Sequence, residues 1–191
     1  MGKLVEGDDG LPAEEVGVWI AEKHELLCDY VQISSATRRK YLPPPRNRGG
    51  AAYIDLFCGP GRSWVKSTGT FSDGGCVAAW RKSVESNAPF SKVIIGDRDP
   101  DRLAAATKRL EKLGAPVVPL LGLAKDTAFT AIQRAGGSGL HFAFLDPYSL
   151  GALDFAIIST LSRLQRIDML VHVSQMDLQR NYYRNSQTDA S

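Results

Sequence analysis

The chain has 191 residues, of which 23 are Lys or Arg and 21 are Asp or Glu, so its formal net charge at pH 7 is +2. This length suits one α/β domain and is short for two, and the small net charge excludes an overall polybasic character. No apolar run is long enough to span a bilayer. We expect no signal peptide in the polar first ten residues, and three isolated cysteines indicate no metal site, no disulfide framework and a cytoplasmic setting.

The N-terminal part is expected to contain a disordered tail and one helix. Residues 1–10 are polar and predict the tail. An early proline at Pro12, followed by Glu14 and Glu15, predicts the start of a helix. An apolar stripe at helical spacing continues it and predicts a face packed on the core. The stripe comprises Val16, Trp19, Ile20, Lys23, Leu26, Leu27 and Tyr30.

A basic, proline-rich segment follows this helix. Three consecutive prolines, 43–45, favour an extended backbone between clustered cations. The cations are Arg38, Arg39, Lys40, Arg46 and Arg48. Such a cluster can hold the phosphate backbone of a nucleic acid, or it can be a solvated linker, which is the simpler interpretation.

The chain is organised around residues 53–61, with the sequence Tyr-Ile-Asp-Leu-Phe-Cys-Gly-Pro-Gly. The β-forming residues predict a short buried strand. Gly59 and Gly61 allow a sharp turn that brings bare N–H groups close to a ligand, at the end of a first parallel strand, where α/β sheets bind nucleotides. Trp64 stands where the dinucleotide fingerprint needs a third glycine, which disfavours an NAD-dependent oxidoreductase. A tight turn without a ligand is the alternative.

The segment after this turn is rich in Gly, Ser and Thr. Residues 62–74 predict an irregular loop, which either covers a ligand, binds a partner or is an ordinary insertion. The next helix is expected to begin near residues 73–75, with Ser72 or Asp73 as its N-cap.

A second strand at residues 92–97 is apolar on both faces, as a buried parallel strand should be. Asp97 ends this strand, and a carboxylate there can accept hydrogen bonds from both hydroxyls of a ribose. Asp99 is expected to cap a helix over residues 100–113.

A third strand is predicted at residues 116–121. Asp126 follows it, in a loop that would border the base of a bound nucleotide. This carboxylate either meets an adenine amino group or caps a helix over residues 127–134, and we favour the cap.

A fourth strand at residues 140–145 runs into Asp146-Pro147-Tyr148, the second candidate site. The Asp146 carboxylate lies at a strand end, where it can accept a hydrogen bond from a substrate N–H and direct its lone pair toward a methyl donor. Tyr148 can stack on a planar substrate. The alternative is a strand-ending turn chosen for local geometry.

A helix over residues 150–164 and a fifth strand over residues 168–173 complete the expected elements. Phe155, Ile158 and Leu161 are expected on the core side of this helix. His172, in the fifth strand, is interpreted as a core residue and not as a ligand. The expected parallel sheet has the strand order 3-2-1-4-5.

A glycine turn after strand one, an acid after strand two and Asp-Pro-aromatic after strand four resemble the class I S-adenosylmethionine-dependent methyltransferases. More narrowly, the chain resembles the three-Cys-motif partner family, a bacterial group similar to methyltransferases. The matching positions are Trp19, Lys23, His24, Leu27, Tyr30, residues 53–62, 75–78, 97–100 and 144–148, Met176, Arg180 and Asn181.

The resemblance implies a Rossmann-like three-layer sandwich with a mostly parallel sheet in residues 49–184, preceded by the tail, helix and linker of residues 1–48 and followed by a disordered tail, 185–191. It implies S-adenosylmethionine as cofactor and methyl transfer to an unidentified acceptor, for example an amino or amide nitrogen. The implied cofactor-binding residues are Asp55, Phe57, Gly59, Gly61, Asp97 and Asp126. The implied acceptor-facing residues are Asp146, Pro147 and Tyr148.

Two departures favour a rival function. Asp146-Pro147-Tyr148 has one proline fewer than the (Asp/Asn/Ser)-Pro-Pro-(Tyr/Phe) motif of amino-methyltransferases. Few residues follow the fifth strand, so we expect the C-terminal antiparallel strand pair of the complete fold to be missing, either because the sequence is truncated or because the sheet stops early. The rival is a non-catalytic partner subunit of a three-cysteine protein that resembles radical S-adenosylmethionine enzymes.

Overall fold

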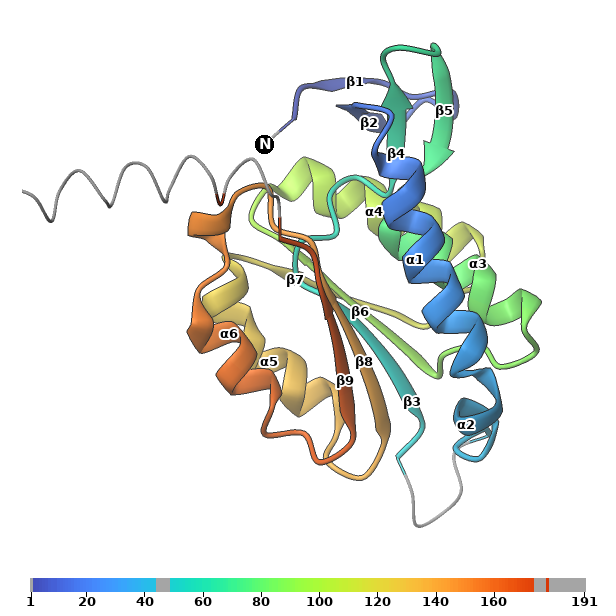
Figure 1. Cartoon of the computed structure of the whole chain (residues 1–191), viewed down its shortest axis with the longest axis vertical. Helices are drawn as coiled ribbons and strands as arrows, with labels where there is room; N and C mark the ends of the chain where they lie inside the picture. The colour runs from blue at the N-terminus through green and yellow to red at the C-terminus, as the bar shows by residue number, and fades with distance from the viewer. Residues whose placement is uncertain (1, 44–48, 174–177, 179–191) are drawn as a thin grey trace, which may run out of the picture.

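The structure, a computed structural model, describes residues 2–43, 49–173 and 178 (Figure 1). Its first half contains β1 (Leu4–Glu6), β2 (Pro12–Val16), α1 (Ile20–Ile33), α2 (Ser35–Arg39), β3 (Ala51–Asp55), β4 (Arg62–Val65), β5 (Thr70–Asp73) and α3 (Gly75–Glu85). Its second half contains β6 (Lys92–Asp97), α4 (Pro100–Lys112), β7 (Val117–Leu121), α5 (Ala124–Ala135), β8 (Leu140–Leu145), η1 (Leu150–Ala152), α6 (Phe155–Leu161) and β9 (Ile167–Val171).

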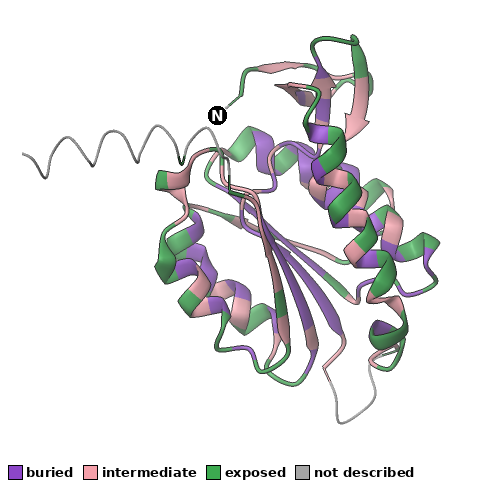
Figure 2. Cartoon of the chain, viewed as in Figure 1, coloured by how far each residue is buried: buried purple, intermediate pink, exposed green. Residues whose placement is uncertain are grey.

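Five strands form an all-parallel sheet in the order β7-β6-β3-β8-β9, which confirms the predicted order 3-2-1-4-5. Helices α1, α3 and α4 lie on one side of this sheet, and α5 and α6 lie on the other (Figure 1). The central strands β6, β3 and β8 are therefore buried between two helical layers, as Figure 2 shows, whereas the edge strands β7 and β9 are only partly buried. The protein has a Rossmann-like α/β fold.

The central strand β3 serves two hydrophobic cores because successive side chains of a strand point to opposite faces. Ala51 and Tyr53 belong to the core shared with α1, α3 and α4. Ala52 and Ile54 belong to the core shared with α5 and α6. All residues of β3 are buried, so the segment that leads into the glycine turn is held from both sides.

The N-terminal segment differs from the prediction. Residues 4–16 form β1 and β2, in place of a disordered tail and a helix from Pro12, and α1 begins only at Ile20. β2 pairs in parallel with β4 and in antiparallel fashion with β1. The local signals predict a helix start, but this segment pairs with a strand that is distant in the sequence. Tertiary context, and not local propensity, therefore determines its structure.

Residues 62–74 also differ, because they form a hairpin and not an irregular loop. β4 and β5 pair in antiparallel fashion, and Gly69, with φ of +66°, lies in the turn between them. With β1 and β2 they complete a four-stranded sheet in the order β1-β2-β4-β5. Gly74, not Ser72 or Asp73, is the N-cap residue of α3.

Of three predictions about helices, one is confirmed and two are wrong. Asp99 caps α4 as expected, because its side chain accepts from the N–H groups of the first turn. Asp126 does not cap α5, which includes it in its first turn and has Leu123 at the N-cap position. The helix predicted over 150–164 is divided into η1 and α6, with Asp154 capping α6.

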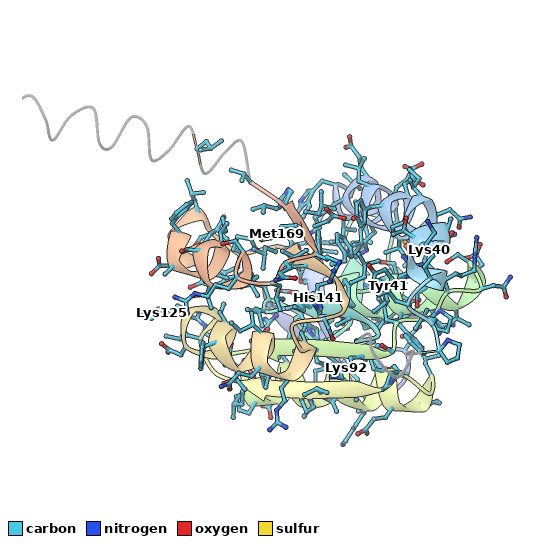
Figure 3. All side chains as sticks on the ribbon, turned by 90° about the horizontal axis from the view of Figure 1, so that it is seen from below. Lys40, Tyr41, Lys92, Lys125, His141 and Met169 are labelled. Carbon is cyan, nitrogen blue, oxygen red and sulfur yellow. The ribbon has the colours of Figure 1, made fainter. Side chains whose placement is uncertain are left out.

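Three apolar side chains expected in the core are exposed. Trp19 at the N-cap of α1 is 52% exposed, Leu26 on α1 is 60% exposed and Phe155 on α6 is 75% exposed. Helical spacing alone put all three on the inner face, whereas the sheet covers a narrower stripe of each helix. His141 is buried at the start of β8 (Figure 3), and burial lowers the pKa of its imidazole to about 4.

The basic segment contains one structural arginine. Arg38 is 1% exposed, and its guanidinium donates hydrogen bonds to the carbonyl of Ala88 and the hydroxyls of Ser34 and Ser86. It therefore attaches α2 to the segment after α3 and does not face a partner. Arg46, Arg48 and prolines 44–45 lie outside the described residues. The predicted C-terminal tail, residues 185–191, and the region where a C-terminal strand pair would follow β9 also lie outside them.

None of the described helices combines the length and the apolar composition that a transmembrane span requires.

Candidate functional site

The carboxyl ends of the parallel strands open into a cleft of about 1400 Å³. The turns after β3, β6 and β8 form its floor, and α1 and the four-stranded sheet contribute its walls. The predicted site residues that line it are Asp55, Phe57, Gly59, Gly61, Asp97, Asp146, Pro147 and Tyr148. Asp126 is exposed on α5 and is not among the lining residues, although its neighbours Leu123 and Lys125 are.

The glycine turn adopts the geometry that its sequence predicted. Gly59 and Gly61 have φ of +57° and +77°, in the left-handed region that glycine alone enters without strain. A Cβ at residue 61 would lie 3.2 Å from Val77 and 3.2 Å from the Cα of Ala106. The second glycine is therefore required both by its backbone angle and by its close approach to α3 and α4.

Asp97 fixes this turn from the neighbouring strand. Its Oδ2 accepts a hydrogen bond of 3.1 Å from the N–H of Gly59, and its Oδ1 accepts one of 2.9 Å from the N–H of Asp99. Burial raises the pKa of this carboxyl above its ordinary value. Each carboxylate oxygen can accept a further hydrogen bond, so Asp97 can hold the turn and still receive the hydroxyls of a ligand.

Asp55 is a buried acid directly beneath the turn. Its carboxylate is 2% exposed and accepts hydrogen bonds from the hydroxyl of Tyr53 and the N–H of Phe57. Burial, with a contribution from the charges of Asp146 and Asp97, raises its pKa to about 7. Near neutral pH this group is poised between two protonation states, so a nearby cation would favour its ionised form.

Asp146 at the end of β8 lies between two cationic or ionisable side chains. Its Oδ2 contacts the ammonium of Lys23 on α1. Its Oδ1 lies 2.9 Å from Nδ1 of His172, just after β9. Three elements distant in the sequence thus meet at this carboxylate.

Lys23 and His172 were missed as site residues by the sequence interpretation. Lys23 was assigned to an apolar stripe, and its charge within that stripe is the signal that could have found it, because lysine is rarely buried without a partner. His172 was interpreted as a core residue, but it is only half-buried and lines the cleft. Its place at a strand end, on the rim shared by Asp97 and Asp146, is the corresponding signal.

Aromatic rings flank this group of charges. The ring planes of Trp19 and His172 are parallel within 4°, with centroids 6.3 Å apart, and the ammonium of Lys23 lies 4.7 Å from the centroid of Trp19. Farther along the cleft, the guanidinium carbon of Arg98 lies 4.8 Å from the ring centroid of Tyr148. These flat, partly exposed surfaces suit a planar ligand.

The N-terminal segment closes one side of the cleft. Oε1 of Glu14 forms an ion pair of 2.8 Å with Arg102 and accepts a hydrogen bond of 2.8 Å from the N–H of Gly2, while its Oε2 faces Gly59, 3.3 Å from the position of an added Cβ. A carboxylate that the sequence interpretation placed in a helix therefore lies against the glycine turn.

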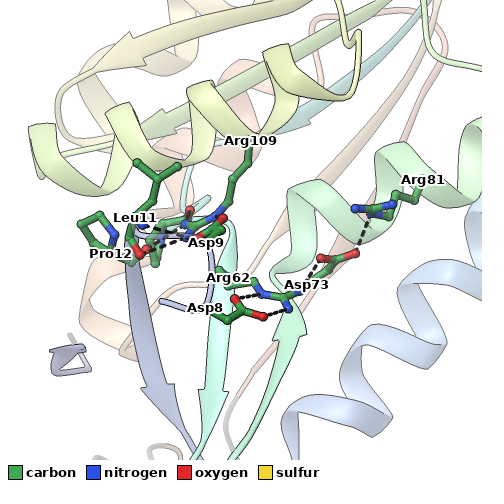
Figure 4. A network of polar contacts seen from close by, with 9 residues as sticks. Asp8, Asp9, Leu11, Pro12, Arg62, Asp73, Arg81 and Arg109 are labelled. Carbon is green, nitrogen blue, oxygen red and sulfur yellow. Dashed lines mark hydrogen bonds and ion pairs between the residues drawn. The ribbon is translucent and has the colours of Figure 1, made fainter. Parts of the chain in front are cut away.

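Arginines fasten this segment in place, as Figure 4 shows. Arg109, 6% exposed on α4, binds both carboxylate oxygens of Asp9 and the carbonyl oxygens of Leu11, Pro12 and Pro60. Because Pro60 lies within the glycine turn, one guanidinium connects the N-terminal segment to the floor of the cleft. Arg62 in turn pairs with Asp8 and Asp73.

Within the residues that the structure covers, no group of three or more His, Cys, Asp or Glu side chains is arranged to hold a metal ion. The sequence matches no protein-family model and no curated protein.

Proposed function

We propose that this protein binds S-adenosylmethionine in the cleft and transfers its methyl group to an acceptor held beside Asp146. The observation that carries the proposal is the convergence of the glycine turn, Asp97 and Asp146 on one rim of a Rossmann-like sheet. In such sheets ligands bind beyond the carboxyl ends of the strands, at the point where the strand order reverses. Here that point is β3, between β6 and β8.

The residues present fit the parts of this cofactor. At Gly59 a Cβ would occupy space beside Glu14 at the edge of the cleft, whereas at Gly61 it would meet α3 and α4 and disturb the turn. Asp97 would accept hydrogen bonds from the ribose hydroxyls, and the carboxylates of Asp55 and Glu14 offer negative charge for the ammonium of the methionine end.

When bound, S-adenosylmethionine would supply an electrophilic methyl group, so that the acceptor's lone pair forms the new bond to carbon while the electrons of the C–S bond return to sulfur. The chain's own residues would act by positioning the two reactants and excluding water. Trp19 and Tyr148 provide flat surfaces for the acceptor, and Asp146 with its two partners provides its polar contacts.

We also propose that the protein belongs to the three-Cys-motif partner family. The support is spatial, because residues that carry the resemblance gather in one place although they are far apart in the sequence. Those lining the cleft include Trp19, Lys23, His24, Arg62, Gly75, Asp97, Asp146, Pro147 and Tyr148.

One observation favours the rival function, a non-catalytic partner subunit. Both oxygens of Asp146 already contact Lys23 or His172, so this carboxylate is less available to receive a substrate amino group than the resemblance implies. A protein of this kind would keep the fold and the ligand without performing transfer.

Calorimetric titration of the full chain with S-adenosylhomocysteine, with NAD as control, tests the proposal. Binding of S-adenosylhomocysteine alone is expected, and binding of neither compound would contradict the proposed cofactor. A methyl-transfer assay on cell extract with wild type and Asp146→Ala then separates the two functions. Transfer that Asp146→Ala abolishes supports the enzyme, whereas cofactor binding without transfer supports the partner subunit.

A further inference from the structure

The close contact between His172 and Asp146 determines which ring nitrogen of the histidine can accept a proton. Nδ1 of His172 lies 2.9 Å from Oδ1 of Asp146, and a carboxylate oxygen only accepts hydrogen bonds. Nδ1 must therefore carry a hydrogen in this arrangement. In the neutral imidazole the other nitrogen, Nε2, then has the free lone pair.

The surroundings hold this arrangement in place. Lys23 contacts the second oxygen of Asp146, which restrains the orientation of the carboxylate. Trp19, with its ring parallel to that of His172 within 4°, restrains the plane of the imidazole. Within the described part of the chain, no hydrogen bond involves Nε2. Since His172 is 34% exposed and lines the cleft, its lone pair is accessible to a bound molecule.

We infer that His172 is the general base of the proposed methyl transfer, with Asp146 and Lys23 as its positioning residues, and that the methyl acceptor is a hydroxyl group. This inference rests on the proposed function and deepens it. A histidine oriented by a carboxylate is an effective proton acceptor because the carboxylate fixes its tautomer and stabilises the imidazolium that forms.

The proton of the acceptor hydroxyl passes to His172 during the transfer. As the acceptor oxygen uses a lone pair to bond the methyl carbon, the electrons of its O–H bond stay on oxygen and the proton moves to Nε2 of His172. The resulting imidazolium is neutralised by Asp146. Nε2 then releases the proton to water at the open side of the cleft, which restores the neutral ring.

The substrate class follows from what each acceptor needs. A neutral amine already presents a strong nucleophilic lone pair and needs only a hydrogen-bond acceptor such as a free carboxylate. A hydroxyl oxygen becomes strongly nucleophilic only as its proton leaves, so it needs a base within reach. Here Lys23 and His172 each contact one oxygen of Asp146, so the carboxylate orients the histidine and Nε2 is the base that can take the proton of a hydroxyl acceptor.

Histidine nitrogen NMR tests the tautomer without any cofactor or acceptor. The chain contains three histidines, and His172→Gln assigns the signal of the third. We expect neutral His172 of the wild type to carry its hydrogen on Nδ1, and Asp146→Ala to shift the balance toward Nε2–H. Observation of Nε2–H in the wild type, or of a permanently charged imidazolium near neutral pH, would overturn the inference.

The substrate class is tested with methyl-labelled S-adenosylmethionine and cell extract as the source of acceptors. Label in methyl ethers that His172→Gln reduces at least 100-fold supports a hydroxyl acceptor, whereas label in methyl esters contradicts it, because a carboxylate acceptor is already ionised and needs no base. Label on nitrogen, or no transfer at all, overturns it. Titration with S-adenosylhomocysteine keeps the two proposals apart. If the compound does not bind wild type, the proposed function fails. If it binds both wild type and His172→Gln normally, but neutral His172 of the wild type carries its hydrogen on Nε2, only this inference is overturned.

Discussion

The N–H of Gly59 donates a hydrogen bond of 3.1 Å to Oδ2 of Asp97, and this bond connects the turn after β3 to the end of the neighbouring strand. The carboxylate assigned to ribose binding therefore also shapes the glycine turn that would receive the methionine end. The two halves of the proposed cofactor site are built as one unit, so a change at either residue should affect both.

Replacement of Asp97 should weaken cofactor binding and stability together. Asp97→Ala leaves two partly buried N–H groups, those of Gly59 and Asp99, without their acceptor, which costs about 1–3 kcal/mol of unfolding free energy. Affinity for S-adenosylhomocysteine should fall at least tenfold. Calorimetry and thermal melting measure the two effects.

The matched control is Asp126→Ala, since this carboxylate is exposed and outside the cleft lining. Asp126→Ala should bind as wild type does. If wild type and Asp97→Ala bind S-adenosylhomocysteine equally well, the assignment of Asp97 to ribose binding is wrong. Weakened binding by Asp126→Ala would indicate that Asp126 is part of the cofactor site.

Asp55 should make stability depend on pH near neutrality. Its pKa is raised from 3.8 to about 7, mainly by burial, so the folded state retains a proton that the unfolded state has lost. The contribution of Asp55 to the free energy of unfolding is fully present below pH 3.8 and is lost as pH rises through about 7. The free energy of unfolding of Asp55→Asn, measured relative to that of wild type, should therefore rise by about 2–3 kcal/mol from pH 5 to pH 8. Denaturant titrations at both pH values measure this gain, and a pH-independent difference would contradict the assignment.

A comparison of two glycines separates backbone strain from close packing. Gly61 and Gly69 both have positive φ, but a Cβ at 61 would meet Val77 and Ala106, whereas a Cβ at 69 would have nothing within 4 Å. Gly69→Ala should therefore cost about 1 kcal/mol from strain alone. Gly61→Ala should cost roughly 2–4 kcal/mol, because packing adds to strain. Equal losses in chemical denaturation would mean that the turn is not packed against α3 and α4 in this way.

Arg109 should be far more important for stability than an exposed arginine in an ion pair. Arg109→Ala removes a buried guanidinium that binds Asp9 and three carbonyl oxygens, and loss of such a network costs about 3–5 kcal/mol. Arg81, 57% exposed and paired with Asp73, is the control, since Arg81→Ala should cost less than about 1 kcal/mol. Urea unfolding of both variants provides the comparison. A small loss in Arg109→Ala would indicate that the N-terminal segment is held by its strand pairing alone.

The central sheet was predictable because its signals are local. β6 and β8 have the predicted bounds, since a strand buried on both faces shows a continuous apolar run that ends at a polar residue. The positive φ values of Gly59 and Gly61 and the capping role of Asp99 were predictable for the same reason, because the residue type itself determines the backbone geometry.

The second sheet was not predictable, because its stability comes from contacts between distant segments. β2 pairs with β4, and its acidic side chains find their partners elsewhere in the chain, Glu14 with Arg102 and Glu15 with Lys66. Lys23 and His172 were missed for the same reason, since their roles arise only when α1 and β9 converge on Asp146.

The attachment of the N-terminal segment by Arg109 has a consequence for the order of events during protein synthesis. The first strands leave the ribosome long before β4 and α4, which supply their pairing partner and their anchoring guanidinium. The wall of the cleft that emerges first therefore cannot assemble until α4 has been translated. Nascent chains shorter than this should lack a finished ligand pocket, and ligand added during translation should protect only chains that have passed this point.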